Sequence, residues 1–375
     1  MQALILAGGE GTRLRPLTST TPKPVIPLVG RPFIGYMIEW LRGHGVDDVI
    51  ISCGFMADGV RAVLGDGAEH GVRLRYVEEP EPLGTGGALK FAEDLLDGRF
   101  FMLNGDVLTD MDLTAQLAQH ERTGARATLA LIAVEDPSAY GLVRLDPDHS
   151  VTDFLEKPSA AEEPTGGETG HDLNLINAGA YILERSVLDV IGPPGTRASI
   201  EREVFPVLVG HGLYGYTSDG YWLDIGTPER YLQATFDILE GIVRTDAGGR
   251  LAAADLALAD GAQVEGRIVA PALVGPGCRI AAGAVVGGRT VLGAGVEVAE
   301  GAHIDTSVVL AGSHIGAGTT IHSAIIGAQV TIGERCHIDG GVVVGAGVSI
   351  GSDNALDHGA RIFPGVQLPP GAIRF

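Results

Sequence analysis

Short apolar runs alternate with stretches of helical spacing along the first 245 residues, and this alternation predicts a sheet covered by helices. Continuous apolar runs are typical of buried parallel strands, and they lie at Ala3–Leu6, Asp48–Cys53, Phe100–Leu103 and Ala127–Ala133. Stretches with helical periodicity lie near Phe33–His44, Gly87–Leu96, Leu113–Thr123 and Glu229–Arg244. We therefore expect an α/β fold, a Rossmann-like domain with a mixed, mostly parallel sheet.

The pattern changes near residue 268, where one aliphatic residue begins to recur at every sixth position. Neither a helix of period 3.6 nor a strand of period 2 gives this spacing. A triangular solenoid gives it, with one short strand per side and the repeated residue pointing inward. The pattern resembles the hexapeptide-repeat left-handed parallel β-helix. The repeated residues are Ile268, Val274, Ile280, Val286, Leu292, Val298, Ile304 and Leu310, then, after a five-residue step, Ile315 and Ile321, and after a second such step Ile326, Ile332, Ile338, Val344, Ile350, Leu356, Ile362 and Leu368.

Between the two patterns, the glycine-rich segment Asp246–Arg250 is interpreted as a linker. We therefore expect an α/β domain over residues 1–245 and a β-helix domain over residues 251–375. A chain of 375 residues is long enough for two domains that each bury a core of their own.

Charge and cysteine content limit the classes of partner. The formal net charge is -21, from 26 basic and 47 acidic residues, which argues against nucleic acid or an anionic membrane as a partner. An acidic protein that binds a phosphate-rich substrate needs local cations and a metal ion. The three cysteines have no metal-ligand spacing, and no apolar stretch approaches the length of a membrane span. We expect a cytoplasmic protein.

Glycines follow the first strand at once, in the segment LILAGGEGTRLRPL. Glycines at a strand end let backbone N–H groups approach a phosphate, and Arg13 and Lys23 can supply the countercharge. The segment lacks the third glycine of a dinucleotide-binding motif, where Leu14 stands, and it has no Walker Gly-Lys-Ser/Thr. The pattern indicates a nucleoside triphosphate site, although an ordinary glycine-rich turn has the same composition.

The same segment resembles the signature GGxGTRLxPLT of the sugar-phosphate nucleotidyltransferases, and TPKP (residues 21–24) resembles their second block. The resemblance implies that Arg13 and Lys23 are catalytic. It also assigns nucleotide binding to Leu6, Gly8, Gly9, Gly11 and Thr12.

Two aspartates are candidate metal ligands. Asp106 follows an apolar strand, at the edge of an open α/β sheet where ligands bind, and Asp224 lies in YWLDIGTPERY. Taken alone, Asp106 could instead cap the next helix, and Asp224 could be a turn residue before the helix led by Thr227 and Pro228. Two carboxylates together can hold an octahedral Mg²⁺ that also binds phosphate oxygens. The family resemblance implies that these two residues are the pair.

Further segments match the family in order. EPEPLGTGGAL contains Gly84 and Thr85, which by resemblance read the nucleobase. The segments AYGLV, FLEKP and NAGAY contain the residues that the resemblance assigns to the sugar phosphate, namely Gly141, Glu156, Lys157 and Asn177. An asparagine amide both donates and accepts hydrogen bonds, which suits vicinal hydroxyls. Each segment alone is equally consistent with a surface turn.

The resemblance implies transfer of a nucleotidyl group from a nucleoside triphosphate to a sugar 1-phosphate, with release of pyrophosphate. Within the family, the segments are closest to mannose-1-phosphate guanylyltransferases that carry a repeat domain, which favours GTP and mannose 1-phosphate. Glucose-1-phosphate thymidylyl- and uridylyltransferases share most of these residues and remain an alternative. The flat faces of a β-helix suit self-association, so we expect a homo-oligomer.

Two alternatives belong to other classes. Some hexapeptide-repeat proteins are acyltransferases with a histidine as general base, and the repeats contain His303, His314, His322, His337 and His358. A solvated histidine is the favoured interpretation for each of them. A non-catalytic regulatory subunit would have lost the signature arginine or a metal carboxylate, whereas Arg13, Asp106 and Asp224 are all present.

Overall fold

The computed structural model describes residues 1–156, 174–252 and 256–374, so Lys157 lies outside the described residues. The chain forms two compact units. The first comprises Met1–Gly9 and Met37–Trp222, and the second comprises Glu10–Tyr36 and Leu223–Phe375. The domain limits at residues 245 and 251 stay a prediction.

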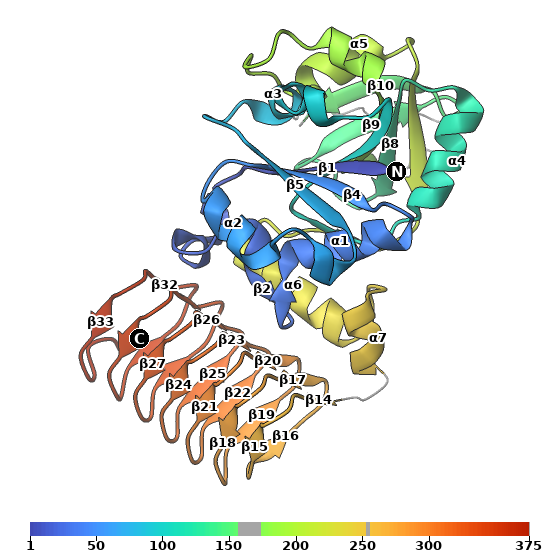
Figure 1. Ribbon diagram of the computed structural model, residues 1–375. Coiled ribbons are helices and arrows are strands. Elements are labelled where there is room, and N and C mark those ends of the chain that lie inside the picture. The colour runs from blue at the N-terminus through green and yellow to red at the C-terminus, as the bar shows by residue number, and fades with distance from the viewer. Residues whose placement is uncertain (157–173, 253–255, 375) are drawn as a thin grey trace. The chain divides into compact units, whose positions relative to one another are not determined.

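A mixed sheet forms the centre of the first unit (Figure 1). Its strands are β1 (Gln2–Ala7), β4 (Asp48–Cys53), β5 (Arg73–Glu78), β6 (Arg99–Asn104), β8 (Ala127–Ala133), β9 (Gly141–Leu145), β10 (Val151–Glu156), β11 (Leu175–Glu184) and β12 (Leu213–Ser218). The main path runs β10-β9-β11-β6-β1-β4-β5, and β8 pairs with β11 and β12. Strand β1 is parallel to β4 and to β6, so the carboxyl ends of these three strands meet at one edge. The predicted fold class is confirmed.

The helices of the first unit bury apolar residues against this sheet. They are α1 (Phe33–Gly43, shared with the second unit), α2 (Ala57–Leu64), α3 (Gly84–Phe91), α4 (Leu113–Thr123) and α5 (Phe205–Leu208). The core includes Leu4, Phe100, Met102 and Tyr181, each less than 1% exposed. The helix expected at Gly87–Leu96 begins three residues earlier, because the carbonyl of Ala198 accepts hydrogen bonds from N–H groups of its first turn.

Helix α4 turns a buried histidine toward the sheet. The ring of His120 lies 2.8 Å from Thr128 Oγ1 and 3.2 Å from Glu184 Oε1, and Arg99 donates to the same Glu184 oxygen at 2.6 Å. Burial lowers the pKa of His120 below its ordinary value of 6.5, and the Arg99 charge acts in the same direction. The pKa of Glu184 is also lowered, by the hydrogen bonds from Arg99 and His120, against the effect of its partial burial.

The lowered pKa of His120 makes stability depend on pH. The unfolded chain binds a proton at this side chain more readily than the folded protein, so the contribution is present above about pH 6.5 and is lost as the pH falls below it. We expect the midpoint temperature of thermal unfolding to decrease as the pH is lowered from about 7 to about 5.5. His120→Gln should lower the midpoint at pH 7 but make it less dependent on pH in this window. Equal slopes for both proteins in a calorimetric pH series would contradict the assignment.

The second unit consists of the segment Glu10–Tyr36, two helices and a parallel β-helix. The N-terminal segment contains 3-10 turns at Thr12–Leu14, Leu17–Ser19 and Lys23–Val25 and a hairpin of β2 (Pro27–Leu28) and β3 (Arg31–Pro32). The helices are α6 (Pro228–Leu239) and α7 (Asp246–Ala252). Strands of two or three residues, from β14 (Leu256–Leu258) to β33 (Gln367–Leu368), stack into three parallel sheets (Figure 1). The predicted solenoid is confirmed.

The inward positions of the β-helix follow the predicted six-residue period except at one coil. Val274, Val286 and Leu292 are fully buried. The expected inward residue Leu310 is wrong, because Val309 is buried instead and pairs in register with Leu292. The five-residue step therefore falls between Ile304 and Val309, one repeat earlier than the predicted step from Leu310 to Ile315.

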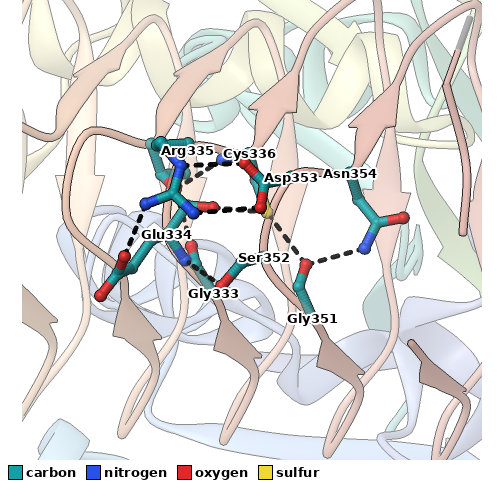
Figure 2. A network of polar contacts seen from close by, with 9 residues as sticks. Gly333, Glu334, Arg335, Cys336, Gly351, Ser352, Asp353 and Asn354 are labelled. Carbon is teal, nitrogen blue, oxygen red and sulfur yellow. Dashed lines mark hydrogen bonds and ion pairs between the residues drawn. The ribbon is translucent and has the colours of Figure 1, made fainter. Parts of the chain in front are cut away.

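Neighbouring coils are also linked by charged side chains on the outside. Arg335 donates to both carboxylate oxygens of Asp353, one coil further on, at 2.9 and 3.0 Å, and to Glu334 at 2.7 Å (Figure 2).

The three cysteines are free thiols in the interior, and burial raises the pKa of Cys53 to about 11. They are packing residues.

The segment Asp246–Arg250, expected as a glycine-rich linker, is helical and belongs to α7. The Thr245 hydroxyl accepts a hydrogen bond from Gly248 N at 2.8 Å and caps the helix, which offsets the low helix propensity of its two glycines.

None of the helices in the described part of the chain has both the length and the apolar character that crossing a bilayer requires.

Candidate active site

In the first unit, the predicted nucleotide and metal residues follow adjacent strands. Leu6 pairs with Asn104 across β1 and β6, and the carbonyl of Leu6 accepts a hydrogen bond from Gly105 N at 2.9 Å. Asp106, the residue after Gly105, therefore lies near the end of β1, where the chain continues into Gly8. Asp106 is half-buried, and the residue that caps α4 is Asp112, which accepts from Ala115 N. The interpretation of Asp106 as a helix cap is wrong.

A glutamate joins the Gly8 end of β1 to the turn before α3. Glu79 accepts hydrogen bonds from the Ser52 hydroxyl at 2.8 Å and from Leu83 N at 3.1 Å. A Cβ placed on Gly8 would lie 3.3 Å from Glu79 Oε1, so the glycine lets the two segments approach. Sequence reasoning missed Glu79, although it opens the segment EPEPLGTGGAL.

Gly84 and Thr85 begin α3 in a tightly packed turn. Gly84 has φ +76°, and a Cβ at this position would lie 2.6 Å from the carbonyl oxygen of Ala198, so only glycine fits. The Thr85 hydroxyl donates to Glu201 at 2.6 Å and accepts from Ile200 N at 2.9 Å. The side chain of Thr85 thus fixes the turn.

The predicted sugar-phosphate residues within the described part of the chain lie on three neighbouring strands. Gly141 in β9 pairs with Glu156 in β10, and the next residue of β9 pairs with Ile176 in β11. Asn177, half-buried, donates to the Tyr181 hydroxyl at 2.9 Å and accepts from Gly179 N at 3.1 Å. These bonds hold its amide in one orientation.

Two aromatic residues that sequence reasoning missed stand beside these strands. Tyr140 precedes Gly141, and its ring meets that of Trp222 edge to face with centroids 5.3 Å apart. Trp222 Nε1 donates to the Ala178 carbonyl at 2.8 Å, next to Asn177. Both aromatics lie inside segments that were singled out for other residues, AYGLV and YWLDIG.

In the second unit, the turn Gly11–Arg15, hereafter the Arg13 turn, presents the signature arginine. Gly11 has φ +60°, and its carbonyl accepts from the Thr18 hydroxyl at 2.8 Å. Lys23 packs on the other side of the turn, with its Cβ 3.2 Å from where a Cβ on Gly11 would lie. Thr12 and Arg13 are exposed. The backbone at Arg13 and that at Lys23 therefore lie close together around Gly11.

The guanidinium of Arg13 lies against the chain that follows Asp224. A Cβ on Gly226 would be 2.6 Å from Arg13 Nη2, so a larger residue here would displace the guanidinium. Asp224 is half-buried and ends β13 (Trp222–Asp224), and Thr227 caps α6, as its Thr-Pro sequence predicted. The Arg13 guanidinium thus contacts the backbone two residues after the Asp224 carboxylate.

This fold and arrangement define the class of protein. A family described as nucleotidyl transferase matches residues 2–241, and a family described as GMPPB C-terminal domain matches residues 268–368. The chain therefore belongs to the nucleotidyl transferase family and is an enzyme, and the resemblance found in its motifs is confirmed.

Particular relatives match over the whole chain. The mannose-1-phosphate guanylyltransferase of Mycobacterium tuberculosis (strain ATCC 25618 / H37Rv) is 38% identical over 100% of this chain and 98% of its own. Mannose-1-phosphate guanylyltransferase 1 of Arabidopsis thaliana is 32% identical, over 100% and 99%. Among solved structures, HddC from Yersinia pseudotuberculosis is 29% identical with a TM-score of 0.52, over 62% of this chain and 97% of that one.

Proposed function

We propose that the enzyme transfers the guanylyl group of GTP to mannose 1-phosphate, forming GDP-mannose and pyrophosphate. The observation that carries this proposal is the match, over the whole chain, to relatives named mannose-1-phosphate guanylyltransferase from a bacterium and a plant. A match confined to the first 241 residues would support the reaction class but not the substrate pair. The expected homo-oligomeric state and cytoplasmic location stay predictions.

The reaction is a single displacement at phosphorus. A phosphate oxygen of mannose 1-phosphate attacks the α-phosphorus of GTP, a new P–O bond forms, and the bond from the α-phosphorus to the bridging oxygen breaks as pyrophosphate leaves. No general base is needed, because the sugar phosphate is already ionised near neutral pH. The barrier arises from bringing two anions together, so positioning and charge stabilisation supply the catalysis.

The cationic residues divide this work between them. Arg13 stabilises the charge on the departing pyrophosphate, and its fork of N–H donors suits phosphate oxygens. Lys23, which packs beside the Arg13 turn, contacts the triphosphate, as does the backbone of Gly8, Gly9, Gly11 and Thr12. Lys157 orients the sugar phosphate, while Gly141, Glu156 and Asn177 bind the sugar.

A magnesium ion fits the chemistry of the two aspartates. Asp106 and Asp224 are half-buried carboxylates, which are the hard oxygen ligands that Mg²⁺ prefers. Within the described residues, no group of three or more His, Cys, Asp and Glu side chains forms a complete metal site. Asp106 and Asp224 would hold the ion together with phosphate oxygens and water, and the ion would offset negative charge on the α-phosphate.

The acyltransferase alternative receives no support from the repeat domain. His303, His314, His322, His337 and His358 are all exposed. His314 has a carboxylate partner, Glu297 at 2.9 Å. A histidine general base also needs a site that excludes water, whereas these side chains face solvent. The thymidylyl- and uridylyltransferase alternatives concern the same catalytic residues and are separated by substrate.

The base-binding turn gives a prediction on substrate affinity. Gly84→Ala forces a strained φ and a clash with the Ala198 carbonyl, so the turn must move. We expect the KM for GTP to rise about tenfold, which corresponds to about 1.4 kcal/mol, while the KM for mannose 1-phosphate changes little. Gly98→Ala is the matched control, because open space surrounds Gly98 and its φ is not positive. An unchanged KM for GTP in Gly84→Ala would contradict the role of this turn.

The function is tested by measuring pyrophosphate release with Mg²⁺, GTP and mannose 1-phosphate together, and with either substrate left out. Release that requires both substrates supports the proposal. Release from GTP alone indicates hydrolysis, and release only when dTTP or UTP is paired with glucose 1-phosphate indicates the alternative substrates. Silence with every pair contradicts nucleotidyl transfer.

A further inference from the structure

An arginine of the β-helix reaches the Arg13 turn. Arg361 stands on β32 (Arg361–Ile362) and is exposed, whereas its neighbour Ile362 packs against the interior of the coil. Its Nη1 donates to the carbonyl oxygen of Arg13 at 2.9 Å and to that of Arg15 at 2.6 Å. Nη1 carries two N–H groups, so one nitrogen can serve both carbonyls.

The carbonyls of Arg13 and Arg15 flank Leu14, the buried residue that anchors the turn. Leu14 is buried, and its N–H donates to the Gly11 carbonyl at 2.9 Å, while Arg15 N donates to the Thr12 carbonyl at 3.2 Å. These bonds close the turn internally. The carbonyls of Arg13 and Arg15 are held from outside, by Arg361, and charge-assisted hydrogen bonds of this kind are stronger than neutral ones.

A second observation places the charge of Arg361 beside the segment that Arg13 contacts. The pKa of Glu229, in the first turn of α6, is lowered by a hydrogen bond with Thr227, by its backbone N–H and by the positive charge of Arg361. Thr227 directly follows Gly226, against which the Arg13 guanidinium lies. Arg361 therefore donates to the turn that carries Arg13, and its charge also acts on the first turn of α6, which follows the segment that the Arg13 guanidinium contacts.

Other arginines of the β-helix make a different kind of contact. Arg335 and Arg279 pair with carboxylates on their own coil or the next one, as Figure 2 shows for Arg335 and Asp353. Arg361 instead donates to main-chain oxygens 348 and 346 residues away in sequence. Exposed ion pairs within a domain contribute little to stability, whereas a contact that orients a catalytic turn affects the reaction.

We propose that Arg361 is a positioning residue for nucleotidyl transfer: the last coils of the β-helix hold the Arg13 turn, and so keep the Arg13 guanidinium where pyrophosphate departs. This inference rests on the proposed role of Arg13. Loss of the contact removes an interaction that matters in the transition state, so kcat and kcat/KM fall together and KM stays unchanged.

The test compares three full-length variants with the wild-type enzyme. Arg361→Ala should lower kcat about tenfold, since small displacements of catalytic groups have effects of this size or larger, with KM for mannose 1-phosphate within about twofold. Arg361→Lys keeps the charge and one donor nitrogen, so it should recover part of the loss. Arg335→Ala, which removes an exposed arginine of the same domain, should leave kcat unchanged.

A readout without substrate separates this inference from the proposed function. Hydrogen exchange at the amides of Leu14 and Arg15 should be faster in Arg361→Ala than in the wild-type protein and in Arg335→Ala. If exchange is faster in Arg361→Ala but the wild-type enzyme is inactive, the contact between Arg361 and the Arg13 turn is supported. The proposed function, and with it the catalytic role of Arg361, is then contradicted. Unchanged exchange, a kcat within twofold of wild type, or an equal loss in Arg335→Ala would overturn the proposal.

Discussion

Replacing Arg13 with alanine should lower kcat by about 10²- to 10³-fold, the range found when one donor to a developing charge is removed. The turn Gly11–Arg15 presents Arg13 against Gly226, two residues after Asp224. Its positive charge meets the pyrophosphate most strongly as the bond to the α-phosphorus breaks. The KM for mannose 1-phosphate should change little, because the proposed role of Arg13 is at the pyrophosphate and not at the sugar. Steady-state kinetics with pyrophosphate detection measures both constants.

Arg15→Ala is the matched control for this substitution. Arg15 belongs to the same turn, but its guanidinium pairs with Glu10 at 2.9 Å. The variant removes the same charge from the same turn, so a general effect of charge would appear in both variants. We expect Arg15→Ala to keep kcat within about threefold of wild type, as surface ion pairs contribute little. A normal kcat for Arg13→Ala, or equal losses in both variants, would contradict the assignment.

Asp106→Asn and Asp224→Asn should each lower kcat by more than about a hundredfold. Loss of a group that only supports a metal ligand already costs about 10- to 100-fold, and these two carboxylates are the proposed ligands themselves. Asparagine keeps the shape of the side chain and removes its charge, so folding should be retained. Excess Mg²⁺ should recover part of the activity, since the remaining carboxylate still binds the ion.

A binding measurement separates metal binding from other roles of the two carboxylates. Titration of Mn²⁺ followed by electron paramagnetic resonance, with GTP present, should show weaker binding in both variants. Asp112→Asn is the control, because Asp112 caps α4 through its side chain and asparagine caps a helix equally well. If Mn²⁺ affinity in Asp106→Asn and Asp224→Asn equals that of wild type, these residues are not the metal ligands.

The sequence predicted the elements whose pattern is repeated or strongly periodic. The bounds expected for β4, β8 and α4 agree with the structure, because each is a continuous buried run or a clear helical period. The β-helix was predictable for the same reason. Its single error, Leu310 in place of Val309, arose because two adjacent aliphatic residues leave the position of a five-residue step undetermined.

The two glycines of α7 led to the prediction of a linker where the structure has a helix. Two glycines disfavour a helix, but the Thr245 cap and the packing of Ala247, which is 6% exposed, stabilise it. Tertiary contacts of this kind override local propensity and leave little trace in a single sequence.

Several contacts of the candidate site join segments that are far apart in the chain. Ser52 reaches Glu79, Thr85 reaches Glu201, and Arg361 reaches the Arg13 turn, over 27, 116 and up to 348 residues. Motifs predicted the residues that are proposed to face a substrate, because that chemistry constrains residue type. The residues that hold those motifs in place are defined only by the fold, and they required the structure.

The central claim is tested most directly by competition in one mixture. The enzyme, Mg²⁺, equal amounts of GTP, dTTP, UTP, ATP and CTP, and equal amounts of mannose, glucose and N-acetylglucosamine 1-phosphates are combined, and the nucleotide sugars are identified by chromatography and mass spectrometry. GDP-mannose should be the dominant product, formed in equal amount with pyrophosphate. A different dominant nucleotide sugar, or no nucleotide sugar at all, would contradict the account.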